Sequence, residues 1–163
     1  MINFLSRKSS DQPHKTKLDY KIIRNATIVL IVFIIPMSYS HEIGHAIICA
    51  SEGNLFQINM SLNNASLVCL GTLENIELFY VFGGFFAMSL ALIPFVKYSW
   101  MINHKWAVIV SLSFAIGHGI NAVIEGGLTL WYLENGLGPE LLMNMTSFFV
   151  YFVLLVYFGR KNE

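Results

Sequence analysis

Four apolar stretches, each close to the length that crosses a lipid bilayer, constrain the fold of this 163-residue chain more than any other feature. A membrane-spanning α-helix needs roughly 20 predominantly apolar residues. Only 12% of the residues are charged, whereas about a quarter is usual in soluble domains. The sequence therefore predicts an all-α membrane protein that lies in a lipid bilayer with about four transmembrane helices, at residues 26–50, 78–96, 106–124 and 141–158.

The distribution of basic residues predicts how these helices are oriented. Lys and Arg occur before the first stretch, between the second and third, and after the fourth, and the other two connections contain none. By the positive-inside rule, we expect a multi-pass protein of the cell membrane with both termini in the cytoplasm. Residues 1–20 are polar and predict a flexible cytoplasmic tail, and residues 21–163 predict one membrane domain. The net charge is zero, and nucleic acid is not an expected partner.

The first connection contains a pattern typical of a β-hairpin. In residues 56–62, Phe, Ile, Met and Leu alternate with Gln, Asn and Ser, as in a half-exposed strand. Asn63-Asn64 suits a turn, and residues 65–70 suit a returning strand. We expect a small hairpin between the first and second membrane helices. Its free edge could pair with an extended peptide, or the hairpin could simply cap the helix.

The first apolar stretch carries the motif His41-Glu42-Ile43-Gly44-His45. On a helix, the two histidines lie one turn apart and project from the same face. Two imidazoles at this spacing can hold one Zn²⁺, and Glu42 is close enough to act as general base on a metal-bound water. Ionisable groups are costly inside a membrane and usually mark a functional site. The motif therefore predicts a zinc site in the membrane.

A third ligand is expected from the third apolar stretch. His118, Asn121 and Glu125 share one helical face at its end. A catalytic zinc ion normally has three protein ligands and one open position, so either Glu125 or His118 should join the two motif histidines. Three polar groups on one membrane helix need partners other than lipid. Packing this face against the motif helix would give the polar side chains of both helices partners other than lipid.

This order of elements resembles the site-2-protease family of intramembrane zinc metalloproteases (peptidase family M50). The shared features are the H-E-x-x-H motif in a membrane helix, a small strand region and a second span with a small-residue patch at Gly83-Gly84, which allows close helix packing. A third span that ends in Asn121 and Glu125-Gly126 completes the arrangement, which covers residues 26–127. The family has Asp where this chain has Glu125, and it has prolines before that position.

The resemblance implies an activity and a role for each site residue. It implies zinc-dependent hydrolysis of peptide bonds in membrane-protein or peptide substrates. His41, His45 and Glu125 would bind Zn²⁺, Glu42 would be catalytic, and Asn121 would bind substrate. Family members generally place this site toward the cytosol, whereas the charge pattern here predicts the outer side.

A second interpretation belongs to a different class of protein. The small size of the chain and the missing proline–Asp signature also suit a non-catalytic metal-binding subunit of a membrane protein complex. The two interpretations differ in Glu42, which only the protease needs for its function. A common test is therefore a variant that removes the carboxylate and leaves the metal ligands intact.

Other residues near the motif allow alternatives. Cys49, one turn beyond His45, could be a soft metal ligand or could pair with Cys69, and we expect instead two buried free thiols. Pro36 predicts either a kink that opens space beside the metal or a proline that the helix tolerates. A small-x-small pattern at residues 38–40 also suits signal-peptide cleavage, but the apolar continuation after the motif favours a membrane helix.

Overall fold

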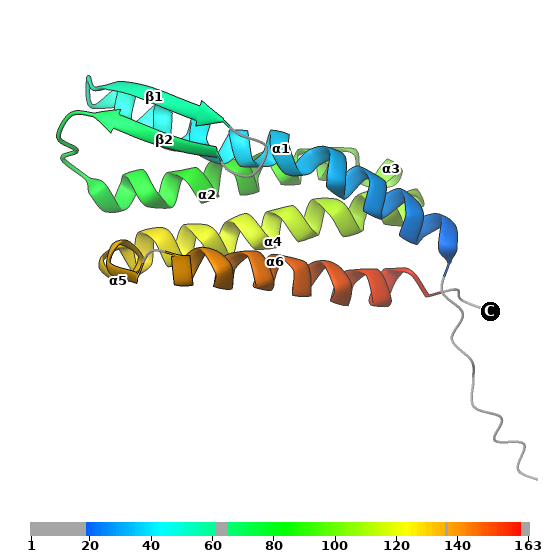
Figure 1. The fold of residues 1–163 in the computed structure, drawn as a ribbon. Helices are drawn as coiled ribbons and strands as arrows, with labels where there is room; N and C mark the ends of the chain where they lie inside the picture. Colours follow the sequence, from blue (N-terminus) through cyan, green and yellow to red (C-terminus); the bar gives the residue numbers. More distant parts are fainter. Residues whose placement is uncertain (1–18, 61–64, 136, 161–163) are drawn as a thin grey trace, which may run out of the picture.

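Four long helices lie side by side in the computed structural model, which describes residues 19–60, 65–135 and 137–160 (Figure 1). They are α1 (Tyr20–Ser51), α2 (Ile76–Leu92), α4 (Lys105–Gly127) and α6 (Leu137–Phe158). Shorter helical segments connect them: η1 (Ile93–Lys97), α3 (Tyr98–Asn103) and α5 (Thr129–Asn135). The predicted tail falls outside the described residues except for Asp19 and Tyr20, and so does the predicted turn at residues 63–64.

Three helical segments of the described chain are long and apolar enough to cross a membrane. They are Tyr20–Ser51, Ile76–Asn103 and Lys105–Gly127, and they match the first three predicted spans. They indicate a membrane protein. The fourth predicted span lies in α6, whose apolar part, Asn144–Phe158, is shorter. A count of about four spans is therefore not confirmed by the described residues.

Helix α1, which carries the motif, is continuous from Tyr20 to Ser51. Asp19 caps its start, where the side chain accepts a hydrogen bond of 2.9 Å from the backbone N–H of Lys21. Pro36 lies inside the helix, and the hydroxyl of Ser40 donates to the Pro36 carbonyl at 2.9 Å. The helix then continues to Ser51, so both motif histidines stand on regular helical backbone.

Glycines let α1 and α4 approach α2 closely. A Cβ atom on Gly44 of α1 would lie 2.6 Å from the carbonyl oxygen of Phe82, and one on Gly84 of α2 would lie 2.5 Å from the backbone nitrogen of Ala122 in α4. Real Cβ atoms do not tolerate such contacts. The predicted close packing at the small-residue patch is thus confirmed, and α2 holds the motif helix and α4 together from one side.

The hairpin is antiparallel and packs on the end of α1 that carries the motif (Figure 1). Strand β1 (Leu55–Met60) pairs with β2 (Ala65–Leu70), with Ile58 opposite Leu67 and Phe56 opposite Cys69. Leu67 and Cys69 pack on a buried cluster that includes Ile48 and Phe79. The predicted hairpin is therefore confirmed between the first and second membrane helices.

A disulfide joins Cys49 of α1 to Cys69 of β2. The expectation of two free thiols was wrong, and so was the alternative of Cys49 as a metal ligand, because its sulfur is already bonded. Register explains the pairing: Cys69 is on the face of β2 that meets the helix, and Cys49 is fully buried there. The bond ties the hairpin to α1 one turn beyond His45.

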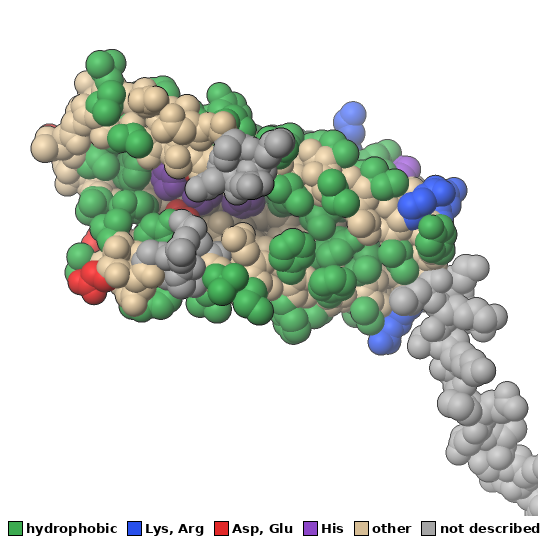
Figure 2. Space-filling view, viewed as in Figure 1, with side chains coloured by type: hydrophobic (Ala, Val, Ile, Leu, Met, Phe, Trp, Pro, Cys, Tyr) green, Lys and Arg blue, Asp and Glu red, His purple; other side chains and the backbone are tan. Residues whose placement is uncertain are grey.

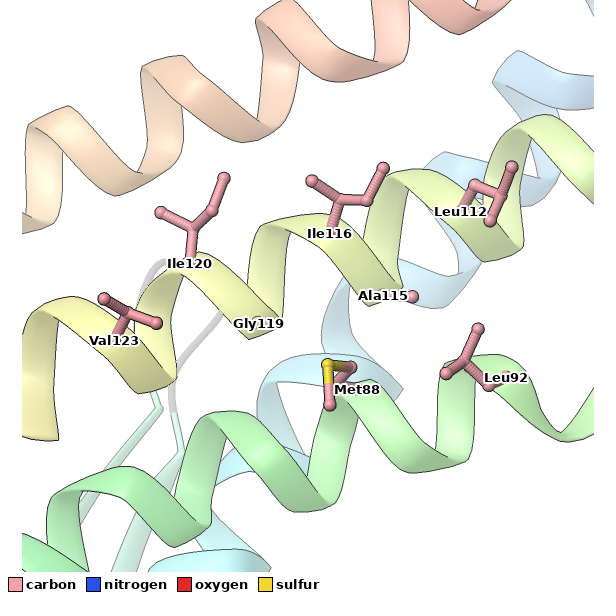
Figure 3. A pocket seen from close by; sticks show the side chains of 8 residues that line it. All are labelled: Met88, Leu92, Leu112, Ala115, Ile116, Gly119, Ile120 and Val123. Carbon is pink, nitrogen blue, oxygen red and sulfur yellow. The ribbon is translucent and has the colours of Figure 1, made fainter.

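An apolar groove of about 470 Å³ lies between α2 and α4 (Figure 3). It is lined by Met88, Leu92, Leu112, Ala115, Ile116, Gly119, Ile120 and Val123. These side chains offer no nitrogen or oxygen atom, as the close-up shows. The groove suits hydrocarbon and contributes no group for chemistry, so the polar residues of α1 and α4 must form the functional site elsewhere.

Candidate metal centre

His41 and His45 of α1 converge with Glu125 of α4 in the interior of the protein. The Nε2 atom of His41 lies 3.0 Å from Nε2 of His45 and 3.1 Å from Oε2 of Glu125. The third side of this triangle, from Nε2 of His45 to the same oxygen, is 3.6 Å. All three residues are buried, with 5–7% of their surface exposed. The three side chains therefore present one ligand atom each to a single point.

These separations fit a metal ion. Tetrahedral zinc with ligands at 2.0–2.1 Å places its ligand atoms about 3.3 Å apart, and the three observed distances bracket that value. Two imidazole nitrogens and a carboxylate oxygen form a donor set that suits zinc and several other divalent ions. The group could thus hold a metal ion, and the geometry leaves its chemical identity open.

A backbone carbonyl fixes the orientation of the His45 ring. Its Nδ1 atom lies 2.7 Å from the carbonyl oxygen of Phe79 in α2. Because a carbonyl can only accept, Nδ1 carries the proton, and the lone pair of Nε2 faces Glu125 and His41. The ring also stacks on the Phe79 side chain, with centroids 4.7 Å apart. Helix α2 therefore fixes the ring of His45 in an orientation that suits a metal ligand.

Glu42 lies at the edge of this group and is not part of it. Its side chain is half-buried, and the backbone of Leu67 in β2 interacts with its carboxylate. The group that could hold an ion within the described residues consists of His41, His45 and Glu125. Glu42 is thus next to His41 in the chain, outside the three ligand candidates, and interacts with both Glu125 and the hairpin.

Of the two candidates for the third ligand, Glu125 belongs to the group that could hold a metal ion. Glu125 joins the two histidines, whereas the ring centroid of His118 lies 5.6 Å from that of His41. His118 stands beside the ligand group instead of in it. Asn121 follows on the same face of α4 and is half-buried, and within the described parts of the chain its Oδ1 atom is buried without a hydrogen-bond partner.

Three contributors to the site were not found from the sequence. The Phe79 carbonyl and the Leu67 backbone act through main-chain atoms, which every residue has, so no pattern of side chains could reveal them. Tyr80 is the third: its ring lies 6.1 Å from that of His45 and 5.9 Å from that of Tyr132 in α5. A single Tyr in an apolar span carries no signal of its own.

The surface view shows how His and basic side chains are distributed over one face of the molecule. His side chains are visible between the hairpin and the α5 end of the molecule, while Lys and Arg side chains gather at the opposite end (Figure 2). Another His side chain is visible at the end where Lys and Arg gather.

No protein-family model, curated protein or solved structure matches this chain. The resemblance to site-2 proteases therefore depends on the motif residues and their order alone, and it stays a prediction. The fold and the site define a class: a helical membrane protein with a buried His-His-Glu group that could hold a metal ion.

Proposed function

We propose that the protein is a zinc-dependent metalloendopeptidase that hydrolyses peptide bonds of membrane-associated substrates. The observation that carries this proposal is that Glu42, the residue after His41, interacts electrostatically with Glu125, while the three ligand atoms lie 3.0–3.6 Å apart. A site that only stores or senses a metal needs the ligands. A hydrolase needs in addition a base next to them, and Glu42 meets this requirement.

The chemistry divides between the ion and the side chains. A zinc ion held by His41, His45 and Glu125 would polarise the scissile carbonyl and activate a water molecule. Glu42 takes the proton from the attacking water and delivers it to the leaving amine. Asn121 hydrogen-bonds the substrate backbone through its side-chain NH₂ group, which can donate to a peptide carbonyl.

The hairpin supplies a place for the substrate chain. Peptide bonds in a membrane helix are hidden by their own hydrogen bonds, so a substrate must unwind locally before it can be cleaved. Residues 56–62 were the expected template for the extended segment. The strand whose backbone interacts with Glu42 is β2, through Leu67. We therefore assign the substrate to the edge of β2, where strand addition would bring its peptide bonds beside Glu42.

The disulfide supports an orientation with the site on the non-cytoplasmic side. Disulfides form and persist in oxidising compartments and are rare in the cytosol. The Cys49–Cys69 bond lies at the same end as His45, away from the basic residues. The positive-inside rule places those basic residues, and with them both termini, in the cytoplasm. Two independent features thus favour substrates that reach the outer half of the membrane.

Glu42→Gln tests the proposal, with Glu77→Gln as the matched control at an exposed site in α2. The full chain, purified in detergent, is assayed for metal by mass spectrometry and for cleavage of casein and of a set of transmembrane peptides. Glu42→Gln should keep the metal and lose cleavage by about 100-fold or more. Glu77→Gln should retain both.

Glu42→Gln also distinguishes the protease from the alternative function. In a non-catalytic metal-binding subunit of a membrane complex, Glu42 performs no chemistry. Unchanged activity of the surrounding complex after Glu42→Gln, together with full metal content, would therefore replace the protease with the subunit.

A further inference from the structure

His118 is a polar residue of the site that neither the ligand group nor the proposed mechanism uses. Its ring faces that of His41 at a centroid distance of 5.6 Å, with the planes tilted by 36°. On its other side it stacks with Phe114, at 6.3 Å. A histidine held between an aromatic ring and a metal-ligand candidate is placed for a specific contact with that candidate.

Three buried polar atoms of His41 and its neighbours on one face of α4 find no hydrogen-bond partner in the described residues. They are Nδ1 of His41, Nδ1 of His118 and Oδ1 of Asn121. The Nδ1 atom of His45, in contrast, has a hydrogen-bond partner, because it donates to the Phe79 carbonyl. When Nε2 of His41 binds an ion, its Nδ1 carries a proton, and a ligating histidine normally donates that proton to a fixed acceptor. The acceptor of His41 must come from its surroundings.

We propose that His118 and Asn121 are positioning residues that hold the His41 ring through one shared buried water molecule. Two hydrogen bonds of about 2.9 Å through one water join atoms at most about 5.8 Å apart, and the ring centroids of His41 and His118 lie 5.6 Å apart. In this arrangement the water accepts a hydrogen bond from Nδ1 of His41 and donates its two protons to Nδ1 of His118 and Oδ1 of Asn121. Buried waters typically make about three hydrogen bonds of this kind. The inference rests on the metal-binding part of the proposed function.

The test is the zinc affinity of His118→Phe, a variant that keeps the aromatic contact with Phe114 and removes both nitrogens. Competition with a chromophoric chelator should show binding weakened by about 10- to 100-fold. His118→Gln, which restores an acceptor, should recover most of the loss. His104→Phe makes the same change in a ring that stacks on Trp100, outside the site, and should bind as the wild type does.

A spectroscopic measurement separates positioning from a general structural effect. With Co²⁺ in place of zinc, His118→Phe should shift the visible bands and keep their tetrahedral intensity, while His104→Phe should leave them unchanged. If His118→Phe does not fold, as judged by circular dichroism and gel filtration, Asn121→Leu replaces it with the same expected weakening.

The outcomes distinguish this inference from the proposed function. Wild-type affinity and wild-type cobalt bands in His118→Phe and Asn121→Leu would overturn the inference alone. Loss of metal as complete as in His41→Ala would make His118 a ligand and would also overturn it. A wild-type protein that binds no zinc would overturn both.

Discussion

The Nε2 atom of His41 lies 3.1 Å from Oε2 of Glu125, although 84 residues separate them in the chain. The contact joins the first and third membrane helices, α1 and α4, at a buried point. Helix α2 makes it possible, because Gly83 and Gly84 bring it within backbone contact of both neighbours. The site thus depends on a helix that supplies no ligand side chain.

Replacement of Glu125 should remove the metal. Glu125→Ala deletes one of the three proposed ligand atoms and should weaken zinc binding by at least about 100-fold, since a catalytic zinc site has only three protein ligands. Glu125→Asp shortens the side chain by one methylene and should give an intermediate affinity. Zinc stoichiometry after dialysis measures both, with Glu134→Ala in exposed α5 as the control. Full zinc occupancy in Glu125→Ala would exclude Glu125 as a ligand.

Gly83 leaves the space that the His45 ring fills. A Cβ atom at this position would collide with Nε2 and Cε1 of His45. Gly83→Ala should therefore push the ring out of the ligand group, weaken zinc binding and cost about 1–3 kcal/mol of stability, as overpacking does. Thermal unfolding and chelator competition measure the two effects.

Gly127→Ala is the matched control, because nothing lies within 4 Å of the Cβ it would add. Equal zinc affinity in the two alanine variants would show that the His45 ring does not depend on the space at Gly83.

The disulfide should stabilise the protein and keep the hairpin at the site. Reduction, or the double change Cys49→Ser and Cys69→Ser, opens a loop of 20 residues and should cost about 2–4 kcal/mol. Cleavage should fall as well, because β2 is then free to leave Glu42. Unfolding temperatures with and without a reductant measure the first effect. Zinc content should persist, since the three ligands lie on α1 and α4. A loss of zinc equal to the loss of cleavage would contradict this account.

The first three apolar helices and the approach of His41 to His45 could be predicted from the sequence because the physics there is local. Apolar length marks the spans, and a four-residue spacing places His41 and His45 on one face whatever the rest of the chain does. The choice between Glu125 and His118 was not local, since both stand on the same stripe of α4. It depends on the position along each helix at which α1 and α4 meet. The close approach of α2 to both helices at its glycines contributes to that position.

The disulfide and the edge of the hairpin could not be predicted for a related reason. Cys49 is on a helix and Cys69 on a strand, and only the register of β2 turns the second sulfur toward the first. The same register directs the backbone of Leu67 to Glu42. The alternating pattern of residues 56–62 correctly predicted a strand, but it could not show which strand of the pair faces the motif.

Removal of the metal should lower the stability of the folded protein. A ligand that binds only the native state stabilises it by RT ln(1 + [L]/Kd), which is about 2.7 kcal/mol at a free concentration of 100 Kd. A chelator should therefore lower the unfolding temperature of the wild type, and added zinc should restore it. His41→Ala serves as the control, because its unfolding temperature should respond to neither addition. An equal response of the two proteins to zinc would locate the bound ion outside the group formed by His41, His45 and Glu125.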